Sequence, residues 1–252
     1  MENLWDYCEQ NVKQKRIVIT GGTTGIGKAT ANLLVSLGAR VLIFGRDTHD
    51  FNTAVEDIKK NFPEGEIYGA PADATKKEDM QMIWEMVDTQ LGGIDILINN
   101  AAIAGNGITN ESYEDWKYIL ETNVMGYLDA CQEAVSRMTE KKSGHIVNIG
   151  SMSAETREKT GTVYVATKAA IRGFSASLRK EINPLGIKVT LIEPGSVVSD
   201  IHSESKEEQE KKMEKLEMLK ADDIAVSVLF CISQPLRSDI ISLQIKPHLQ
   251  II

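Results

Sequence analysis

The chain contains 252 residues, of which 42% are hydrophobic and 25% are charged, as expected for a globular protein with a sizeable core. Its net charge of −8 argues against nucleic-acid binding, which needs clustered Lys and Arg, and no apolar run is long enough to cross a membrane. The three cysteines, at positions 8, 131 and 231, predict neither a disulfide framework nor a metal site. Residues 1–14 lack an apolar segment, so we expect a leader before the first strand, no export signal, and a cytoplasmic protein.

Short apolar runs rich in β-branched residues alternate with longer amphipathic stretches along the chain. The runs predicted to be strands cover residues 16–20, 40–45, 66–72, 94–99, 145–150, 188–192 and 241–245. The stretches predicted to be helices cover residues 25–37, 51–61, 78–90, 111–140, 163–182 and 221–232. Apolar strands that alternate with helices form parallel sheets buried on both faces. We therefore predict one α/β domain over residues 1–252, a Rossmann-type, doubly wound, mostly parallel seven-stranded sheet with helices on both faces.

A highly charged segment, residues 203–220, follows the sixth predicted strand and contains six Glu and five Lys. Met213, Leu216 and Leu219 form only a thin apolar stripe along it. One interpretation is a solvated surface helix. The other is a mobile lid over a substrate cleft, because ligands of open α/β sheets bind beyond the carboxyl ends of the strands.

A glycine-rich loop, residues 20–27 (TGGTTGIG), joins the first predicted strand to the first predicted helix. Glycines there let the backbone approach a pyrophosphate closely, and the helix N-terminus offers N–H groups and the positive end of its dipole. The spacing differs from the G-x-G-x-x-G of other dinucleotide folds, and a simple tight turn is the alternative. We expect cofactor contacts from Gly21, Thr23, Thr24, Gly25, Ile26 and Gly27.

The end of the second predicted strand bears on the choice of cofactor. An acidic residue often binds the ribose 2′-hydroxyl at this point, but here Gly45 stands there and Arg46 follows. A guanidinium can bind a 2′-phosphate through two hydrogen bonds, which favours NADP over NAD. If Asp47 points into the pocket instead, NAD becomes possible, and Arg46 as a solvated charge is a third interpretation.

Four polar residues later in the chain are candidates for chemistry. Tyr164 and Lys168 lie one helical turn apart, so the ammonium can lower the pKa of the phenol and the two can act as a general acid–base pair. Ser151 follows the fifth strand, where its hydroxyl can bind a carbonyl oxygen or cap a turn. Asn123 lies within an apolar helix, where it either caps a local irregularity or holds a water in a proton relay.

Taken together, these motifs resemble the short-chain dehydrogenase/reductase family over residues 15–247. The resemblance rests on the glycine loop, on residues 99–102 (NNAA) in place of NNAG, and on the Pro194-Gly195 pair. It also rests on the order of the family's catalytic tetrad, which would here be Asn123, Ser151, Tyr164 and Lys168.

The resemblance implies a role for each matching residue. Tyr164 would exchange a proton with the substrate oxygen, Lys168 would bind the nicotinamide ribose, Ser151 would position the substrate, and Asn123 would support a proton relay. Asp73 would contact the adenine. Further cofactor contacts are implied for Ala74, Asn100, Ala101, Tyr164, Lys168, Pro194 and Gly195.

A finer resemblance, at residues 192–195 and 239–250, is to the NADP-dependent 3-hydroxy acid and serine dehydrogenases. These oxidise small β-hydroxy acids or reduce related semialdehydes, and they are usually tetramers. Arg157 would then pair with a substrate carboxylate, although a solvent-facing charge is the alternative. The family's two long helices form a dimer interface, so we expect a homo-oligomer, either a dimer or a tetramer.

Two other functions stay open. One is a carbonyl or 3-oxoacyl reductase that uses the same chemistry on another substrate. The other is a non-catalytic NADP sensor, a class that tends to lose the tyrosine or the lysine.

Overall fold

A seven-stranded parallel sheet forms the centre of the computed structural model, which describes residues 10–159, 161–199 and 205–250. The strand order is β3-β2-β1-β4-β5-β6-β7, and every pair of neighbours is parallel. The strands are β1 (Arg16–Thr20), β2 (Arg40–Gly45), β3 (Ile67–Pro71), β4 (Ile96–Asn99), β5 (Gly144–Ile149), β6 (Ile187–Pro194) and β7 (Ser242–Ile245). The order reverses between β1 and β4, which is where such sheets bind ligands.

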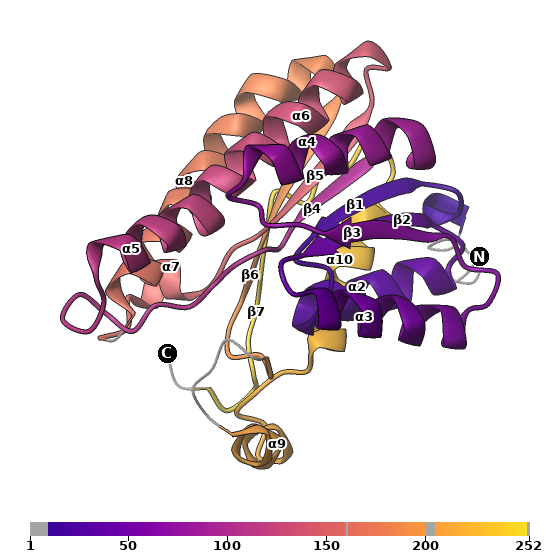
Figure 1. Cartoon of the computed structure of the whole chain (residues 1–252). Coiled ribbons are helices and arrows are strands. Elements are labelled where there is room, and N and C mark those ends of the chain that lie inside the picture. Colours follow the sequence, from indigo (N-terminus) through magenta and orange to yellow (C-terminus); the bar gives the residue numbers. More distant parts are fainter. Residues whose placement is uncertain (1–9, 160, 200–204, 251–252) are drawn as a thin grey trace.

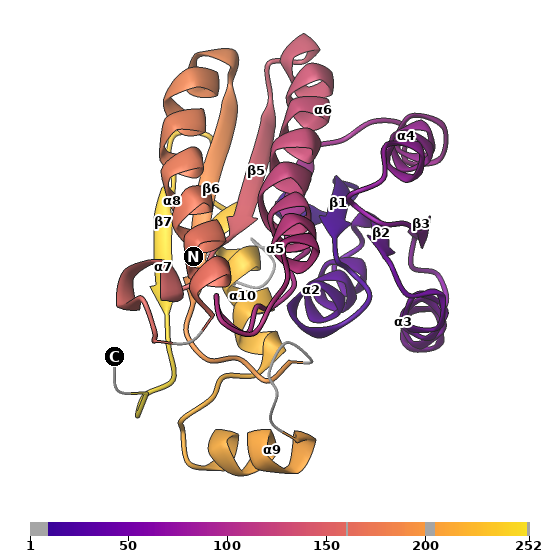
Figure 2. The ribbon, with the colours of Figure 1, turned by 60° about the vertical axis from the view of Figure 1, so that its left-hand side comes forward.

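Helices cover both faces of the sheet (Figures 1 and 2). One layer contains α2 (Gly25–Ser36), α3 (Thr48–Asn61) and α10 (Ala221–Ile232). The other contains α4 (Lys77–Met86), α5 (Tyr113–Leu120), α6 (Gly126–Glu140) and α8 (Thr162–Ile182). Side chains of β1 alternate between the layers: Ile17 and Ile19 belong to the core under α2, and Val18 to the core under α4 and α6. The predicted doubly wound fold is confirmed.

The helix expected over residues 111–140 contains an irregularity that periodicity did not indicate. It begins at Tyr113, after Ser112 and Asp115 form a reciprocal capping box. Between α5 and α6 the backbone forms a π-helical segment, η2 (Glu121–Met125), and Asn123 lies within it. Such π-bulges occur often at functional sites, so the position of Asn123 is informative.

The charged segment after β6 is described from residue 205 onward and includes α9 (Lys206–Glu214). Of the predicted stripe, Met213 and Leu219 are half-buried and Leu216 is exposed. Two residues outside the stripe, Gln209 and Met218, are buried. Gln209 Oε1 accepts a hydrogen bond from the N–H of Ser199 at 2.9 Å, which ties α9 to the residues after β6. Residues 203 and 204 of the predicted lid, and 1–9 of the predicted leader, lie outside the described residues.

Four short elements complete the list: η1 (Val87–Leu91), α7 (Ser153–Thr156), η3 (Asn183–Leu185) and the π-helical segment already described. Among the helices that the structure describes, none combines the length and the apolar character needed to cross a membrane.

Candidate active site

The glycine loop between β1 and α2 brings three backbone segments into close contact. Gly21 and Gly25 adopt left-handed conformations, with φ of 62° and 49°. A Cβ at Gly27 would lie 2.1 Å from the carbonyl oxygen of Gly21, and one at Gly21 would lie 2.8 Å from Cα of Ala101. Any side chain at these positions would push the segments apart, which explains why the loop requires glycine.

The segment after β4 braces this loop. The Asn100 side chain donates to the carbonyl oxygens of Thr20 at 3.1 Å and Gly21 at 2.8 Å. The N–H groups of Asn100 and Ala101 both donate to Thr20 Oγ1 at 2.9 Å. At the start of α2 the side chain of Thr24 makes no capping hydrogen bond within the described chain, so the first N–H groups face the loop. This narrow, donor-lined cradle fits a pyrophosphate.

Packing at the end of β2 explains why no acidic side chain stands there. A Cβ at Gly45 would lie 2.4 Å from Thr23 Oγ1, so Thr23 fills the space that a side chain would need. The carboxylate of Asp47 caps α3 by accepting from the N–H groups of His49 and Asp50 at 2.8 and 2.9 Å. This cap starts α3 at Thr48, three residues before the predicted start at 51, and it engages one carboxylate oxygen of Asp47 with the helix backbone.

Arg46 and Asp73 lie on neighbouring strand ends and are joined through a residue that the sequence analysis did not single out. Arg46 Nη1 donates to the hydroxyl of Tyr118 on α5 at 2.8 Å. That hydroxyl lies 3.1 Å from Asp73 Oδ2. Because Tyr118 is 72 positions from Arg46 in the chain, only the fold brings them together.

Three of the predicted catalytic residues lie close together, with Ser151 and Lys168 buried and Tyr164 half-buried. Ser151 follows β5, and its hydroxyl is near enough to the phenol of Tyr164 on α8 to lower the pKa of that phenol. Lys168 lies one turn further along α8, with Nζ 5.6 Å from the centroid of the Tyr164 ring. Burial raises the pKa of Tyr164, and the hydrogen bond from Ser151 opposes that rise. A phenol with a raised pKa stays protonated at neutral pH and can donate its proton.

Lys168 is only 2% exposed, and its ammonium donates to the carbonyl oxygen of Ile149 at 3.0 Å. Burial lowers the pKa of Lys168 to about 8, so the group still carries its charge at pH 7. Tyr127 donates to the same carbonyl oxygen at 3.0 Å, and Lys168 Nζ lies 5.6 Å from the centroid of its ring. Sequence reasoning treated Tyr127 only as an apolar residue of its helix, so it missed this second anchor for the Lys168 site.

Asn123 is fully buried, and its amide is engaged by protein groups. Its Oδ1 accepts from the N–H of Ile103, and its Nδ2 donates to the carbonyl oxygen of Ile103, both at 2.9 Å. Nδ2 also lies 3.2 Å from Thr167 Oγ1, which itself donates to the carbonyl oxygen of Tyr164 at 2.7 Å. Asn123 therefore connects the π-helical segment, the loop after β4 and the turn of α8 between Tyr164 and Lys168.

The helix α7, which follows Ser151, carries the candidate substrate residue. Arg157 lies exposed at the end of α7 in a left-handed conformation, with φ of 55°. The neighbouring Glu155 is paired: its Oε2 lies 3.0 Å from Arg172 Nη2 and 2.8 Å from Gln244 Nε2. Arg172 also binds the buried Glu193 through two hydrogen bonds, at 2.7 and 2.9 Å. Arg172 thus lies between two carboxylates, and Arg157 is a further positive charge near Glu155.

The predicted motif after β6 lies against the C-terminal part of the chain. The N–H of Gly195 donates to the carbonyl oxygen of Ile245 at 2.7 Å. A Cβ at Gly195 would lie 2.3 Å from Gln250 Oε1, so the tail packs directly on the Pro194-Gly195 pair.

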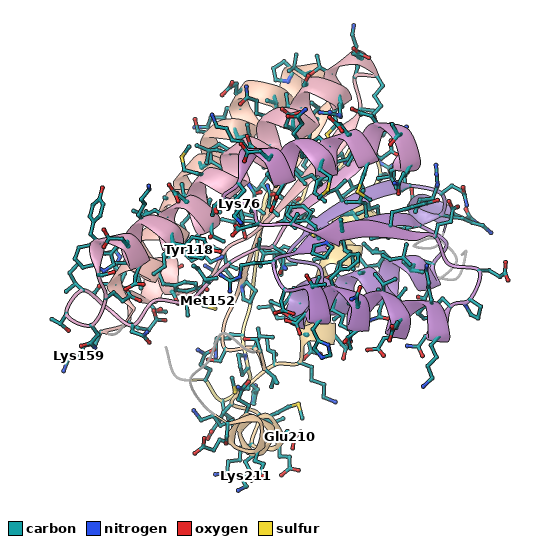
Figure 3. All side chains as sticks on the ribbon, in the orientation of Figure 1. Lys76, Tyr118, Met152, Lys159, Glu210 and Lys211 are labelled. Atoms are coloured by element: carbon teal, nitrogen blue, oxygen red, sulfur yellow. The ribbon has the colours of Figure 1, made fainter. Side chains whose placement is uncertain are left out.

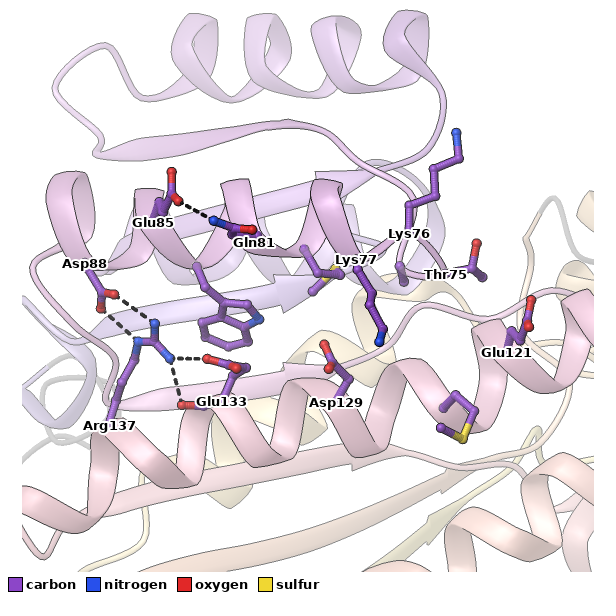
Figure 4. A pocket seen from close by; sticks show the side chains of 14 residues that line it. Thr75, Lys76, Lys77, Gln81, Glu85, Asp88, Glu121, Asp129, Glu133 and Arg137 are labelled. Atoms are coloured by element: carbon purple, nitrogen blue, oxygen red, sulfur yellow. Dashed lines mark hydrogen bonds and ion pairs between the residues drawn. The ribbon is translucent and has the colours of Figure 1, made fainter.

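A separate groove of about 540 Å³ runs between α4 and the helix formed by η2 and α6 (Figure 4). Arg137 organises one end of it by binding Asp88 and Glu133, and its guanidinium lies 5.0 Å from the centroid of the Trp84 ring. Of the predicted site residues only Ala74 lines this groove. It is therefore distinct from the cluster of Ser151, Tyr164 and Lys168. Among the described residues, no group of three or more His, Cys, Asp or Glu is arranged to hold a metal ion.

Comparison with known proteins agrees with this architecture. The sequence model of the family described as short chain dehydrogenase matches residues 15–210. An uncharacterized oxidoreductase of Staphylococcus aureus (strain MRSA252) is 33% identical over 234 residues, which cover 92% of this chain and 97% of the relative.

Two solved structures extend the comparison. The crystal structure of gox2181 has a TM-score of 0.82 and 26% identity, and the match covers 96% of this chain and 98% of that one. A variant actinorhodin polyketide ketoreductase, solved with NADPH, has a TM-score of 0.82 and 25% identity, with 93% and 97% covered.

The fold and these matches define an oxidoreductase of the kind that uses NAD or NADP. The chain belongs to the short-chain dehydrogenase/reductase family.

Proposed function

We propose that the chain transfers a hydride between NADP(H) and a small alcohol or carbonyl compound, of the 3-hydroxy acid or semialdehyde class. The observation that carries this proposal is the cluster of Ser151, Tyr164 and Lys168 beyond the carboxyl end of β5. In a parallel sheet this end also holds the glycine cradle, so a bound nucleotide and the cluster would share one site.

The cofactor would be held along the carboxyl ends of the strands. Its pyrophosphate would lie on the loop that contains Gly21, Thr23, Thr24, Gly25, Ile26 and Gly27. Asp73, Ala74, Asn100 and Ala101 would line the nucleotide, and Pro194 and Gly195 would flank the nicotinamide. When bound, the nicotinamide supplies or accepts the hydride.

The protein would supply the proton and the position of the substrate. In the reductive direction Tyr164 donates its phenolic proton to the carbonyl oxygen, and in the oxidative direction it takes the proton back. Ser151 holds the same oxygen through its hydroxyl. The positive charge of Lys168, with Nζ 5.6 Å from the centroid of the Tyr164 ring, would stabilise the phenolate that forms. Asn123 keeps Thr167 and α8 in register with this cluster.

NADP, rather than NAD, is supported by the end of β2. No acid can stand at Gly45, Asp47 is engaged as a helix cap, and Arg46 is exposed beside the site. The similar ketoreductase structure contains NADPH, which points in the same direction.

A small acidic substrate is supported by Arg157, whose exposed side chain lies at the end of the helix that follows Ser151. The likeness to a polyketide ketoreductase supports a second candidate substrate class, 3-oxoacyl compounds, for the same chemistry.

The test is turnover of NADPH and NADH with a panel of small β-hydroxy acids, semialdehydes, 3-oxoacyl thioesters and neutral ketones. We expect NADP(H)-dependent activity that Tyr164→Phe abolishes, with the best substrate among the acids or semialdehydes. Tight NADPH binding without turnover of any compound would instead favour the non-catalytic sensor.

We also propose that the chain forms a homo-oligomer, either a dimer or a tetramer. Leu120 and Met125 on the long helix, and Val226 and Phe230 on α10, expose apolar side chains that a second copy could cover. Light scattering that gives the mass of one chain would refute this.

A further inference from the structure

The Arg46 guanidinium does not stand alone at the adenosine end of the proposed site. Its Cζ lies 5.6 Å from the centroid of the Tyr118 ring, and Nη1 lies 2.8 Å from the Tyr118 hydroxyl. Figure 3 shows Tyr118 on α5, whereas Arg46 and Asp73 follow the ends of β2 and β3. One phenol therefore joins side chains from three separate elements.

The direction of each hydrogen bond follows from the chemistry of the groups. A guanidinium can only donate, so the Tyr118 oxygen accepts from Arg46 and its own proton points to Asp73 Oδ2, at 3.1 Å. The other oxygen, Oδ1, accepts from Thr75 N at 3.0 Å and from Thr75 Oγ1 at 2.8 Å. Both oxygens of Asp73 are thus engaged, and the phenol stands between the carboxylate and the guanidinium.

This arrangement leaves the phosphate-binding edge of Arg46 available. The edge formed by Nε and Nη2 makes no hydrogen bond with any residue that the structure describes. A phosphate binds best to such a paired edge. Arg46 is exposed, so without Tyr118 its long side chain would sample many rotamers or turn toward the carboxylate of Asp73.

We propose that Tyr118 is a positioning residue for cofactor choice, which holds the Arg46 guanidinium ready for the 2′-phosphate of NADP(H). The proposal rests on the proposed function, because it takes Arg46 as the ligand of that phosphate. Tyr118 acts on the phosphate through Arg46, and Thr75 still holds Asp73 when the Tyr118 hydroxyl is removed, so ligands that carry the phosphate should be affected far more than those that lack it.

The experiment is calorimetric titration of the full chain with NADPH, NADH and adenosine 2′,5′-bisphosphate. We expect Tyr118→Phe to weaken binding of the two ligands with a 2′-phosphate about tenfold, and to change the Kd of NADH less than about twofold. In the background of Arg46→Ala, Tyr118→Phe should have no further effect, because its partner is already absent. The matched control is Tyr113→Phe, on the same helix, whose side chain is 70% exposed and should leave every Kd unchanged.

Each other result has a definite meaning. If Tyr118→Phe weakens NADPH and NADH equally, or weakens neither, the proposal is wrong. The same holds if the effects of Arg46→Ala and Tyr118→Phe simply add. If Arg46→Ala itself leaves the preference for NADPH unchanged, the 2′-phosphate assignment in the proposed function fails, and this inference fails with it. Melting curves of each variant identify loss of folding.

Discussion

The two ends of the proposed cofactor site differ in burial and in the way their charges are balanced. At the catalytic end, Lys168 is buried, its ammonium donates to a backbone carbonyl, and burial lowers its pKa to about 8. At the adenosine end, Arg46 is exposed, and hydrogen bonding with Tyr118 raises its already high pKa. Burial thus brings the pKa of Lys168 close to neutral pH, where it can take part in proton chemistry. Pairing with Tyr118 instead fixes the position of Arg46, which stays charged at any physiological pH.

The largest effect should come from the catalytic end. Tyr164→Phe removes the phenol that would donate the proton to the carbonyl oxygen, and we expect kcat to fall by about 10²–10⁴. The Kd of NADPH should change little, because the cradle and Arg46 are untouched. Stopped-flow turnover and calorimetry measure the two quantities. A variant that keeps more than about a tenth of the activity would contradict the role of Tyr164.

The next effect tests the adenosine end. Arg46→Ala removes charge-assisted hydrogen bonds to the 2′-phosphate, and we expect kcat/KM with NADPH to fall about 10- to 100-fold while kcat/KM with NADH is nearly unchanged. Steady-state kinetics with both cofactors measure the ratio. An equal loss with both would place Arg46 outside the 2′-phosphate site.

A smaller effect is the dependence of activity on pH, which should reflect Lys168 at the catalytic end and not Arg46 at the adenosine end. Because the pKa of Lys168 is lowered to about 8, its ammonium is present below that pH and is lost above it. We expect kcat/KM for carbonyl reduction to fall up to about tenfold per pH unit above pH 8, since the phenolate loses its stabilising charge. The measurement uses subsaturating NADPH, so that kcat/KM reports the free enzyme. A kcat/KM that stays constant between pH 7 and pH 10 would contradict this expectation.

The smallest effect concerns a buried base remote from both ends. His145 Nε2 lies 2.8 Å from Thr190 Oγ1, which itself donates to the carbonyl oxygen of Ile240, so the imidazole donates through Nε2. Burial lowers the pKa of His145 to about 4 from its usual 6.5. The unfolded chain therefore binds the proton first, and stability should fall as pH decreases from 6.5 to 4, by up to about 1.4 kcal/mol per unit.

Urea denaturation at pH 7, 6 and 5 measures this loss. In His145→Gln the slope between pH 6.5 and pH 4 should be smaller, although the variant is less stable at pH 7. An unchanged slope would assign the acid sensitivity to other groups.

The sequence predicted the sheet well because its strands are apolar runs bounded by glycine, and local patterns of that kind survive in the fold. Asn123 within an apolar helix suggested a local irregularity as one interpretation, but its π-helical form could not be predicted, because it depends on hydrogen bonds between Asn123 and the distant Ile103. The early start of α3 was missed because Asp47 was considered as a cofactor ligand rather than as a helix cap. Local sequence patterns therefore predict where helices and strands lie, whereas irregularities within them depend on polar contacts between residues far apart in the chain.

The candidate site shows the same division. The glycine loop and the spacing of Tyr164 and Lys168 are readable from the sequence because they lie within single elements. The roles of Tyr118 and Tyr127 could not be predicted from the sequence. A tyrosine fits the apolar periodicity of an amphipathic helix equally well whether it fills the core or binds a charged partner. Their partners, Arg46 and Lys168, lie on other elements.

The contact between Thr23 and Gly45 has a consequence for anyone who wishes to redesign the nucleotide preference of this enzyme. A carboxylate-bearing residue at position 45 would place its Cβ 2.4 Å from Thr23 Oγ1, so that single substitution would disturb the loop proposed to bind the pyrophosphate. A smaller residue at position 23 must accompany it. Because the side chains at positions 23 and 45 would occupy the same space, variants intended to favour NAD should change both residues together rather than one at a time.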